Sequence, residues 1–281
     1  MINVTAILET RANVRAARQA GKKIGFVPTM GALHDGHMAL VREAKRRCDF
    51  VSASIFVNPT QFGPNEDFAR YPRTFDADQW KLEAEGVDLL FAPSVEEMYP
   101  AGATTFINVD GIGDRLDGRS RPGHFRGVAT VVAKLFHIMD PDIAFFGQKD
   151  AAQLAVIKRM VRDLMLPVEI AVVPIVREKD GLAMSSRNAY LSPEERRQAT
   201  VLSRALRKVE RSYLNGEKDS AHLILEARKV FSEEPSVKVD YVEVIEADTL
   251  EAVPSAKNGT LVAVAAFIGK TRLIDNLLLN A

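Results

Sequence analysis

The sequence has almost no cysteine and no excess of charge of either sign. Cys48 is the one cysteine among 281 residues, which excludes an intrachain disulfide and is typical of a reducing compartment. Lys and Arg together number 37, as do Asp and Glu, so the formal net charge is zero. A broad nucleic-acid surface needs basic excess, so we expect no nucleic-acid partner. A neutral total still allows single anion-binding pockets.

Long hydrophobic runs are also lacking. The longest, Leu261–Ile268, is far shorter than the roughly 18 residues of a membrane-spanning helix. Glu9, Arg11, Arg15 and Arg18 interrupt the first twenty residues, which leaves no apolar segment for a secretory signal peptide. We therefore expect a soluble, cytoplasmic protein without a membrane segment.

Apolar material is nevertheless sufficient for a core, at 47% of the residues, and the length corresponds to about two domains. Short apolar runs alternate with helical patterns through the first two thirds of the chain. The predicted strands are Ile24–Pro28, Phe50–Val57, Val87–Phe91, Ile143–Phe146 and Val168–Val173. This alternation predicts an α/β fold with a mainly parallel sheet and helices on both faces.

The pattern changes after about Pro174. Ser192-Pro193-Glu194-Glu195 predicts a capped helix start, and we expect this helix to reach Asn215-Gly216. A second helix and two strand candidates, Val239–Glu246 and Thr260–Ile268, follow it. We therefore predict a first domain of residues 1–174 and a smaller α+β domain of residues 175–281.

The densest chemical signal is residues 28–37, Pro-Thr-Met-Gly-Ala-Leu-His-Asp-Gly-His, between a predicted strand and a predicted helix. Ligands of such folds bind beyond the carboxyl ends of strands, where helix starts offer N–H groups to anions. Gly31 and Gly36 let the backbone approach a ligand, and His34 and His37 can both donate hydrogen bonds to a polyphosphate. The alternative is a loop whose histidines only cap and pack. The combination favours phosphate binding.

A zinc site is a second interpretation of His34 and His37. Zinc usually needs a third protein ligand, and metalloprotease histidines lie four residues apart on a formed helix. Asp35-Gly36 separates these two histidines, and no strong third ligand is evident. We therefore predict no protein-bound metal.

Gly147-Gln148-Lys149-Asp150 follows the strand Ile143–Phe146 and precedes a helix, as the histidine segment does. Lys149 could neutralise charge on a transferring phosphate, and Asp150 could bind a ribose hydroxyl or hold a side chain. Gln153, one turn further along, would face the same region. An ordinary helix start explains the segment equally well when it is taken alone.

Three further segments are polar. Asp180 to Asn188 places two hydroxyls beside an arginine, which suits a triphosphate or pyrophosphate but also an interdomain turn. Asn58 and Gln61 end the second strand and are suited to orienting a small hydroxy acid, or to capping that strand. Gly111 to Gly127 is rich in Gly and Arg, and we interpret most of it as a solvated loop.

Together these segments closely resemble the pantoate–β-alanine ligase family over nearly the whole chain. The resemblance is carried by Pro28 to His37, by Phe56-Val57-Asn58-Pro59-Thr60-Gln61-Phe62, by Arg121 to Val128, by Phe146 to Asp150 and by Asp180 to Asn188. His34-Asp35-Gly36-His37 also resembles the two-histidine signature of the wider nucleotidylyl-transferase superfamily. Met184-Ser185-Ser186-Arg187 stands where that superfamily has a mobile phosphate-binding loop.

The resemblance implies a Rossmann-like first domain, a smaller C-terminal lid domain, Mg²⁺-ATP as cosubstrate and a homodimer. It implies condensation of (R)-pantoate with β-alanine to pantothenate, a coenzyme A precursor, through a pantoyl adenylate, with release of pyrophosphate and AMP. It gives His37 the proton-donor role. We predict that His34 and Lys149 also take part in catalysis, because they supply donors at the carboxyl ends of the strands. The ATP-binding residues would be Met30, Gly31, Ala32, Leu33, His34, Asp35, Gly36, His37, Gly147, Gln148, Lys149, Asp150, Val176, Met184, Ser185, Ser186 and Arg187. Gln61 would bind both pantoate and β-alanine, and Gln153 would bind pantoate. We add Asn58 to the substrate-binding residues because of its amide at the end of the second strand.

Two rival functions remain open at this point. A nucleotidyltransferase acting on a phosphate ester would release pyrophosphate without an amine acceptor. A nucleotide-sensing module would bind ATP and form no AMP.

Overall fold

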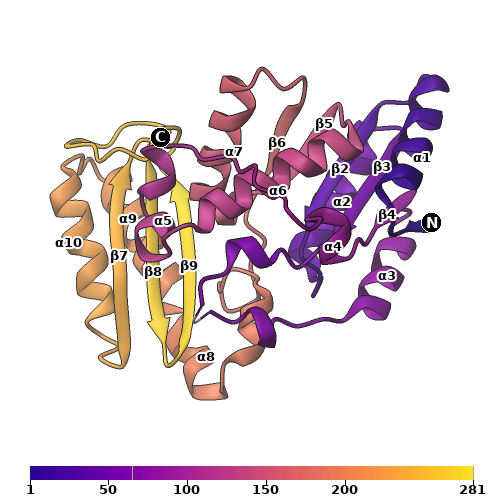
Figure 1. The fold of residues 1–281 in the computed structure, drawn as a ribbon. Helices are drawn as coiled ribbons and strands as arrows, with labels where there is room; N and C mark the ends of the chain where they lie inside the picture. The colour runs from indigo at the N-terminus through magenta and orange to yellow at the C-terminus, as the bar shows by residue number, and fades with distance from the viewer. Residues whose placement is uncertain (65, 281) are drawn as a thin grey trace. The chain divides into compact units, whose positions relative to one another are not determined.

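A computed structural model describes residues 1–64 and 66–280 (Figure 1). Contacts between residues divide the chain into two compact units. The first unit consists of Met1–Gly147 and Val156–Pro174. The second consists of Gln148–Ala155 and the chain from Ile175 onward. The short segment Gln148–Ala155, which the sequence prediction placed in the first domain, therefore groups with the second unit.

The first unit is built on a six-stranded sheet in the order β1-β4-β3-β2-β5-β6, and every neighbouring pair is parallel. Its strands are β1 (Ile2–Val4), β2 (Ile24–Thr29), β3 (Phe50–Ile55), β4 (Leu89–Phe91), β5 (Ile143–Gly147) and β6 (Glu169–Val173). The predicted parallel sheet is confirmed, and all five predicted strands are present. Strand β1 was not predicted, because its three residues are too few to show a pattern.

Side chains of a strand alternate between the two faces of the sheet, so apolar side chains lie on both faces and helices pack against them. The α-helices that begin in the first three fifths of the chain are α1 (Ile7–Gln19), α2 (Asp35–Arg47), α3 (Phe75–Ala84), α4 (Val95–Met98), α5 (Asp117–Ser120), α6 (His124–Met139) and α7 (Ala151–Asp163). Val27 and Val51 pack with Val41 and Ala44 of α2 in one buried cluster. Two other helices, α1 and α6, also contact β2.

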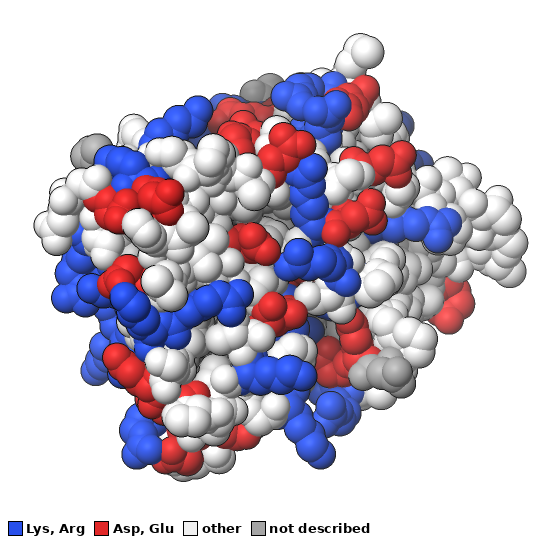
Figure 2. All heavy atoms as spheres, turned by 90° about the vertical axis from the view of Figure 1, so that its left-hand side faces the viewer, with Lys and Arg blue, Asp and Glu red and all other residues white. Residues whose placement is uncertain are grey.

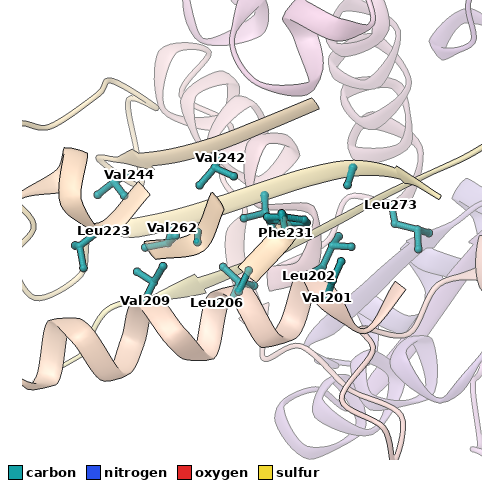
Figure 3. Packing of buried hydrophobic residues seen from close by; sticks show 14 of the residues in the cluster. Val201, Leu202, Leu206, Val209, Leu223, Phe231, Val242, Val244, Val262 and Leu273 are labelled. Atoms are coloured by element: carbon teal, nitrogen blue, oxygen red, sulfur yellow. The ribbon is translucent and has the colours of Figure 1, made fainter. Parts of the chain in front are cut away.

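The second unit contains a three-stranded antiparallel sheet in the order β7-β8-β9, which confirms the predicted α+β class. Its elements are η5 (Ser186–Tyr190), α8 (Pro193–Ala199), α9 (Val201–Leu214), α10 (Ser220–Phe231), β7 (Val237–Ile245), β8 (Leu261–Ile268) and β9 (Thr271–Leu278). Apolar side chains of α9, among them Leu206 and Val209, pack against Val242 and Val262 of the sheet (Figure 3). Strand β9 was not predicted, because the polar side chain of Asp275 is among its buried residues.

The predicted long helix after Ser192 is wrong in one respect, because it is divided at Thr200 into α8 and α9. The predicted cap is confirmed: Glu195 N donates to Ser192 Oγ at 3.2 Å, and Ser192 N donates to the Glu195 carboxylate at 2.9 Å. The Thr200 hydroxyl donates to Arg197 O at 2.8 Å, and such side-chain bonding competes with the helical hydrogen bonds. In residues 1–64 and 66–280, no helix is long and apolar enough to cross a membrane.

Charges of both signs intermingle on the face of the molecule shown in Figure 2. In the second unit, Lys208 and Lys229 both pair with Glu226, at 2.8 and 2.6 Å. Arg204 pairs with Glu233 at 3.2 Å. Acidic partners therefore accompany these basic side chains of α9 and α10, as a neutral composition predicts.

Candidate active site

The segment Met30–His37, here called the histidine loop, joins β2 to α2 and brings its two imidazoles together. His34 is the N-cap residue of α2. Gly36 N donates to His34 Nδ1, and His34 N donates to His37 Nδ1, each at 3.2 Å. The ring centroids lie 4.1 Å apart with an interplanar angle of 43°. The backbone of the loop thus fixes both rings.

These contacts determine which nitrogen of each neutral ring carries the proton. A neutral imidazole has one donor and one acceptor nitrogen. Because Nδ1 accepts a backbone hydrogen bond in both His34 and His37, Nε2 carries the hydrogen in both. In their neutral form both rings thus carry an Nε2–H donor, a group of the kind that binds phosphate oxygens.

We expected backbone amides of the loop to bind an anionic ligand, but the structure uses them for contacts within the protein. Gly31 N donates to Thr29 Oγ1 at 3.2 Å. Ala32 N and Leu33 N both donate to the carboxylate of Asp78, each at 2.8 Å. These amides already have acceptors within the protein, so the ligand-binding donors we assign to this loop are its imidazoles.

Asn58, at the carboxyl end of β3, is 1% exposed, and its hydrogen-bonding groups are all used within the protein. Its Nδ2 donates to Gln61 Oε1 at 3.0 Å and to Gly127 O at 3.2 Å. Its Oδ1 accepts from Thr60 Oγ1 and Tyr99 Oη, both at 2.9 Å. Asn58 therefore orients Gln61 and has no group left over for a ligand.

Gln61, on η1 (Pro59–Gln61), is consequently held with a known amide orientation. Its Oε1 accepts from Asn58, and its Nε2 lies 3.1 Å from Met30 Sδ, where thioether sulfur is only a weak acceptor. Gln61 is 8% exposed. The amide thus directs its NH₂ donor towards a residue of the histidine loop.

Two residues of the Gly- and Arg-rich stretch hold the backbone of Gln61. His124 Nδ1 donates to Gln61 O at 2.8 Å, and Arg121 Nη1 donates to His124 Nε2 at 3.0 Å. Arg121 also forms two hydrogen bonds to the Glu66 carboxylate, at 2.7 and 2.5 Å. Burial, followed by the charge of Arg121, lowers the pKa of His124 to about 4. The interpretation of this stretch as a mostly solvated loop therefore misses a network that supports Gln61.

In the second unit, η4 (Gln148–Asp150) is tied to β9 through one asparagine. Asn276 Nδ2 donates to Gln148 O at 3.0 Å and to Lys149 O at 2.8 Å, while Gln148 Nε2 donates to Asn276 Oδ1 at 3.1 Å. Lys149 Nζ lies 3.2 Å from Asp150 Oδ1. No motif in the sequence marks Asn276, whose role follows only from the pairing of β8 with β9.

Lys149 also lines a small cavity of the second unit together with Ser185 and Arg187. The cavity has a volume of about 20 Å³, enough for a single water molecule. Ser185 is the N-cap residue of η5, and its Oγ accepts from Arg187 N at 3.3 Å. The structure thus brings together two of the predicted phosphate-binding segments.

The remaining predicted residues have simpler surroundings. Met184 N donates to Val176 O at 3.0 Å, which holds these two predicted residues together. Gln153 is half-buried on α7. Across that same part of the chain, no group of three or more His, Cys, Asp or Glu side chains could hold a metal ion.

An open cavity of about 310 Å³ in the first unit contains none of the predicted residues. It is lined by arginines of α1, including Arg11 and Arg15, and by apolar residues such as Phe136. Its size therefore does not mark it as the site.

Comparison with known proteins identifies the family of the chain. The model of the pantoate-beta-alanine ligase family matches residues 3–278. The pantothenate synthetase of Acidobacterium capsulatum is 60% identical over 291 residues, covering 100% of this chain and 97% of the relative. That of Koribacter versatilis is 58% identical, covering 99% of this chain and 96% of the relative.

Solved structures agree with the sequence relatives. The crystal structure of pantothenate synthetase from Thermus thermophilus has a TM-score of 0.96 and 47% identity, with 100% of both chains covered. The pantoate-beta-alanine ligase of Francisella tularensis, solved with beta-gamma ATP and beta-alanine, has a TM-score of 0.82 and 36% identity, covering 99% of this chain and 97% of that one. With this match along nearly its whole length, the chain belongs to the pantoate–β-alanine ligase family.

Proposed function

We infer that the chain is an ATP-dependent, AMP-forming ligase that joins (R)-pantoate to β-alanine and produces pantothenate. The observation that carries this inference is the pair of adjacent imidazoles, each with its Nδ1 accepting a backbone hydrogen bond, in a loop whose Met30 contacts the oriented amide of Gln61. Membership of the family indicates which substrates the chain uses. The imidazoles and the glutamine amide offer hydrogen bonds that suit the phosphate and carboxylate oxygens of those substrates.

The reaction consists of two displacements. A carboxylate oxygen of pantoate attacks the α-phosphorus of ATP, so that a new O–P bond forms and pyrophosphate leaves. The neutral amine of β-alanine then attacks the acyl carbon of pantoyl adenylate, a C–N bond forms, AMP leaves, and the nitrogen loses one proton. Neither step needs a protein nucleophile, so catalysis depends on positioning and on neutralising phosphate charge.

We assign the first displacement to four hydrogen-bonding or charged side chains. His37 takes the proton-donor role, with its Nε2–H directed to an oxygen of the triphosphate, and His34 assists it. Lys149 and Arg187 carry the positive charge that the departing pyrophosphate requires. Met30–His37, chiefly through its imidazoles, and Gly147–Asp150, Val176 and Met184–Arg187 complete the proposed ATP site.

We assign pantoate and β-alanine to Gln61, and pantoate also to Gln153. Gln61 Oε1 is occupied by Asn58, so Gln61 offers its NH₂ group, which suits a carboxylate or hydroxyl oxygen. Asn58, which we expected to bind substrate, contributes through this orientation of Gln61.

Three further properties belong to the proposal. Mg²⁺ enters as part of the Mg²⁺-ATP substrate. The enzyme works as a homodimer, as the family resemblance implies. It acts in the cytoplasm, which is supported by a single cysteine among 281 residues.

An AMP-release assay tests this function directly. ATP, pantoate and β-alanine are supplied together, and each is then omitted in turn. We expect AMP only from the complete mixture, and pyrophosphate already without β-alanine in single-turnover amounts. Pyrophosphate release that never leads to amine-dependent AMP would favour the nucleotidyltransferase alternative. ATP binding without either product would favour a sensing module.

A further inference from the structure

We propose that Asp78, which lies outside the histidine loop on α3, is the positioning residue that sets the geometry of His34 and His37. The inference rests on the proposed function, since it concerns the donors assigned to ATP. It concerns a residue that touches no assigned ligand and acts only through the backbone of the loop.

The carboxylate of Asp78 is fully buried and bound to consecutive amides of the loop. Asp78 is 0% exposed. Its Oδ2 accepts from Ala32 N and its Oδ1 from Leu33 N, each at 2.8 Å, and Thr74 Oγ1 donates to Oδ2 at 3.1 Å. A buried carboxylate is costly unless donors compensate it, and these three donors do so. The arrangement is therefore specific to this loop path.

The loop needs such an anchor because its backbone is strained. Gly31 has φ of 83° and Ala32 has φ of 51°, so two successive residues adopt left-handed conformations. For alanine this conformation costs about 1–2 kcal/mol. Successive N–H groups of such turns converge on one anion, and here that anion is the side chain of Asp78. Without it, the preferred backbone of Ala32 would be right-handed or extended.

The same helix also holds the carbonyl side of the loop. Lys81 Nζ, one turn after Asp78, donates to Leu33 O at 2.5 Å. The peptide groups on both sides of Leu33 are thus fixed by α3, immediately before His34. Because His34 N donates to His37 Nδ1 and Gly36 N to His34 Nδ1, a change in the path at Leu33 alters both rings.

A purely structural role makes a different kinetic prediction. A buried residue that only stabilises the fold would affect both displacements alike, through the amount of folded enzyme. A residue that positions the imidazoles should slow adenylate formation, because donor geometry matters most where phosphate charge develops. The reaction of β-alanine with preformed adenylate should change much less.

The test variant is Asp78→Asn, which keeps the size of the side chain but places an NH₂ donor against one loop amide. Single-turnover adenylate formation from ATP and pantoate should fall about 10–100-fold, in the range of a displaced catalytic group. The reaction of synthetic pantoyl adenylate with β-alanine should change less than about threefold. Imidazole ¹⁵N spectra should show loss of the Nε2–H form that His34 and His37 share in the parent enzyme.

Two matched variants serve as controls. Thr74→Val removes a donor to Asp78 but keeps both loop amide bonds, and Thr10→Val removes a buried hydroxyl that donates to Ala6 O at the start of α1. Both should retain adenylate formation within about threefold of the parent enzyme. If Asp78→Asn does not fold, Lys81→Met, which removes the contact to Leu33 O, should slow the same step selectively but less.

The outcomes separate this proposal from the proposed function. If the parent enzyme produces no AMP from ATP, pantoate and β-alanine, the proposed function fails regardless of Asp78. If the parent is active and Asp78→Asn slows both displacements equally, or neither, the positioning role is overturned. An unchanged pair of imidazole tautomers in that variant would overturn it as well.

Discussion

The two segments assigned to phosphate binding are anchored by different kinds of interaction. The histidine loop is held by buried hydrogen bonds to Asp78, whose side chain has no exposed surface. Part of the attachment of the segment Asp180–Arg187 lies near the surface, where Arg196 pairs with Glu178 at 2.6 Å and with Asp180 at 2.9 Å. The Arg196 and Glu178 side chains are 29% and 30% exposed.

This difference indicates different mechanical properties. Buried hydrogen bonds are shielded from salt and impose one geometry, whereas partly exposed ion pairs are screened and contribute little each. The hydrogen bond from Arg196 lowers the pKa of Glu178, so the pair persists at neutral pH. We therefore regard the histidine loop as preorganised and the second segment as more adjustable.

The largest expected effects come from removing a proposed phosphate donor, either His37 or Lys149. His37→Ala and Lys149→Ala should each slow adenylate formation by about 10²–10³-fold, or roughly 3–4 kcal/mol, as for other transition-state donors. Single-turnover measurement with ATP and pantoate gives the rate. If only one variant is slow, the segment that contains its residue is catalytic, and the other segment has a structural role. Near-normal rates in both would remove the role assignments.

The first unit should also lose stability in acid because of His124. Its pKa is about 4 in the folded protein against 6.5 for an ordinary histidine, so the unfolded chain binds a proton that the folded protein does not between these values. His124 therefore makes its full contribution to the free energy of unfolding above pH 6.5. This contribution falls as the pH drops towards 4, by up to about 3 kcal/mol.

Urea unfolding at pH 7, 5.5 and 4.5 measures this loss. His124→Asn should flatten the pH dependence of the free energy of unfolding. Equal pH dependence in the His124→Asn variant and the parent enzyme would show that other groups cause the acid sensitivity.

Gly127→Ala tests how rigidly Gln61 is supported. An added Cβ would lie 2.3 Å from Thr60 O and 2.7 Å from Gln61 Cα, so η1 would have to move. We expect a loss of about 1–3 kcal/mol in stability, as for other overpacked sites, and weaker pantoate binding. Gly113→Ala is the control, because its Cβ would approach no atom more closely than 3.9 Å.

Calorimetric titration of each ligand distinguishes the possible results. Gln61→Ala should weaken pantoate binding and leave ATP binding nearly intact, and Gly127→Ala should have the same pattern. Collapse of ATP affinity in either variant would contradict the assignment of Gln61 to the smaller substrates.

Much of the first unit could be predicted from sequence because its signals are local. The alternation of short apolar runs, loops and helical patterns identified the parallel sheet. The spacing of His34 and His37 identified the loop between β2 and α2. The roles of Asp78 and Asn276 could not be predicted, since their partners lie 45 or more residues away in the chain. The resemblance named the substrates, but it could not indicate that Asn58 uses all its hydrogen bonds internally.

The smallest effect concerns the ion pairs of the second unit. Glu178→Gln should weaken the pairing with Arg196 by about 1 kcal/mol, and amides of residues 181–188 should then exchange with solvent about fivefold faster. Raising the salt concentration should speed exchange in the parent enzyme at these residues and leave the amides of Ala32 and Leu33 unchanged. Salt-sensitive exchange at Ala32 and Leu33 would mean that both segments are anchored alike, because a buried carboxylate–amide contact is screened far less than a surface pair.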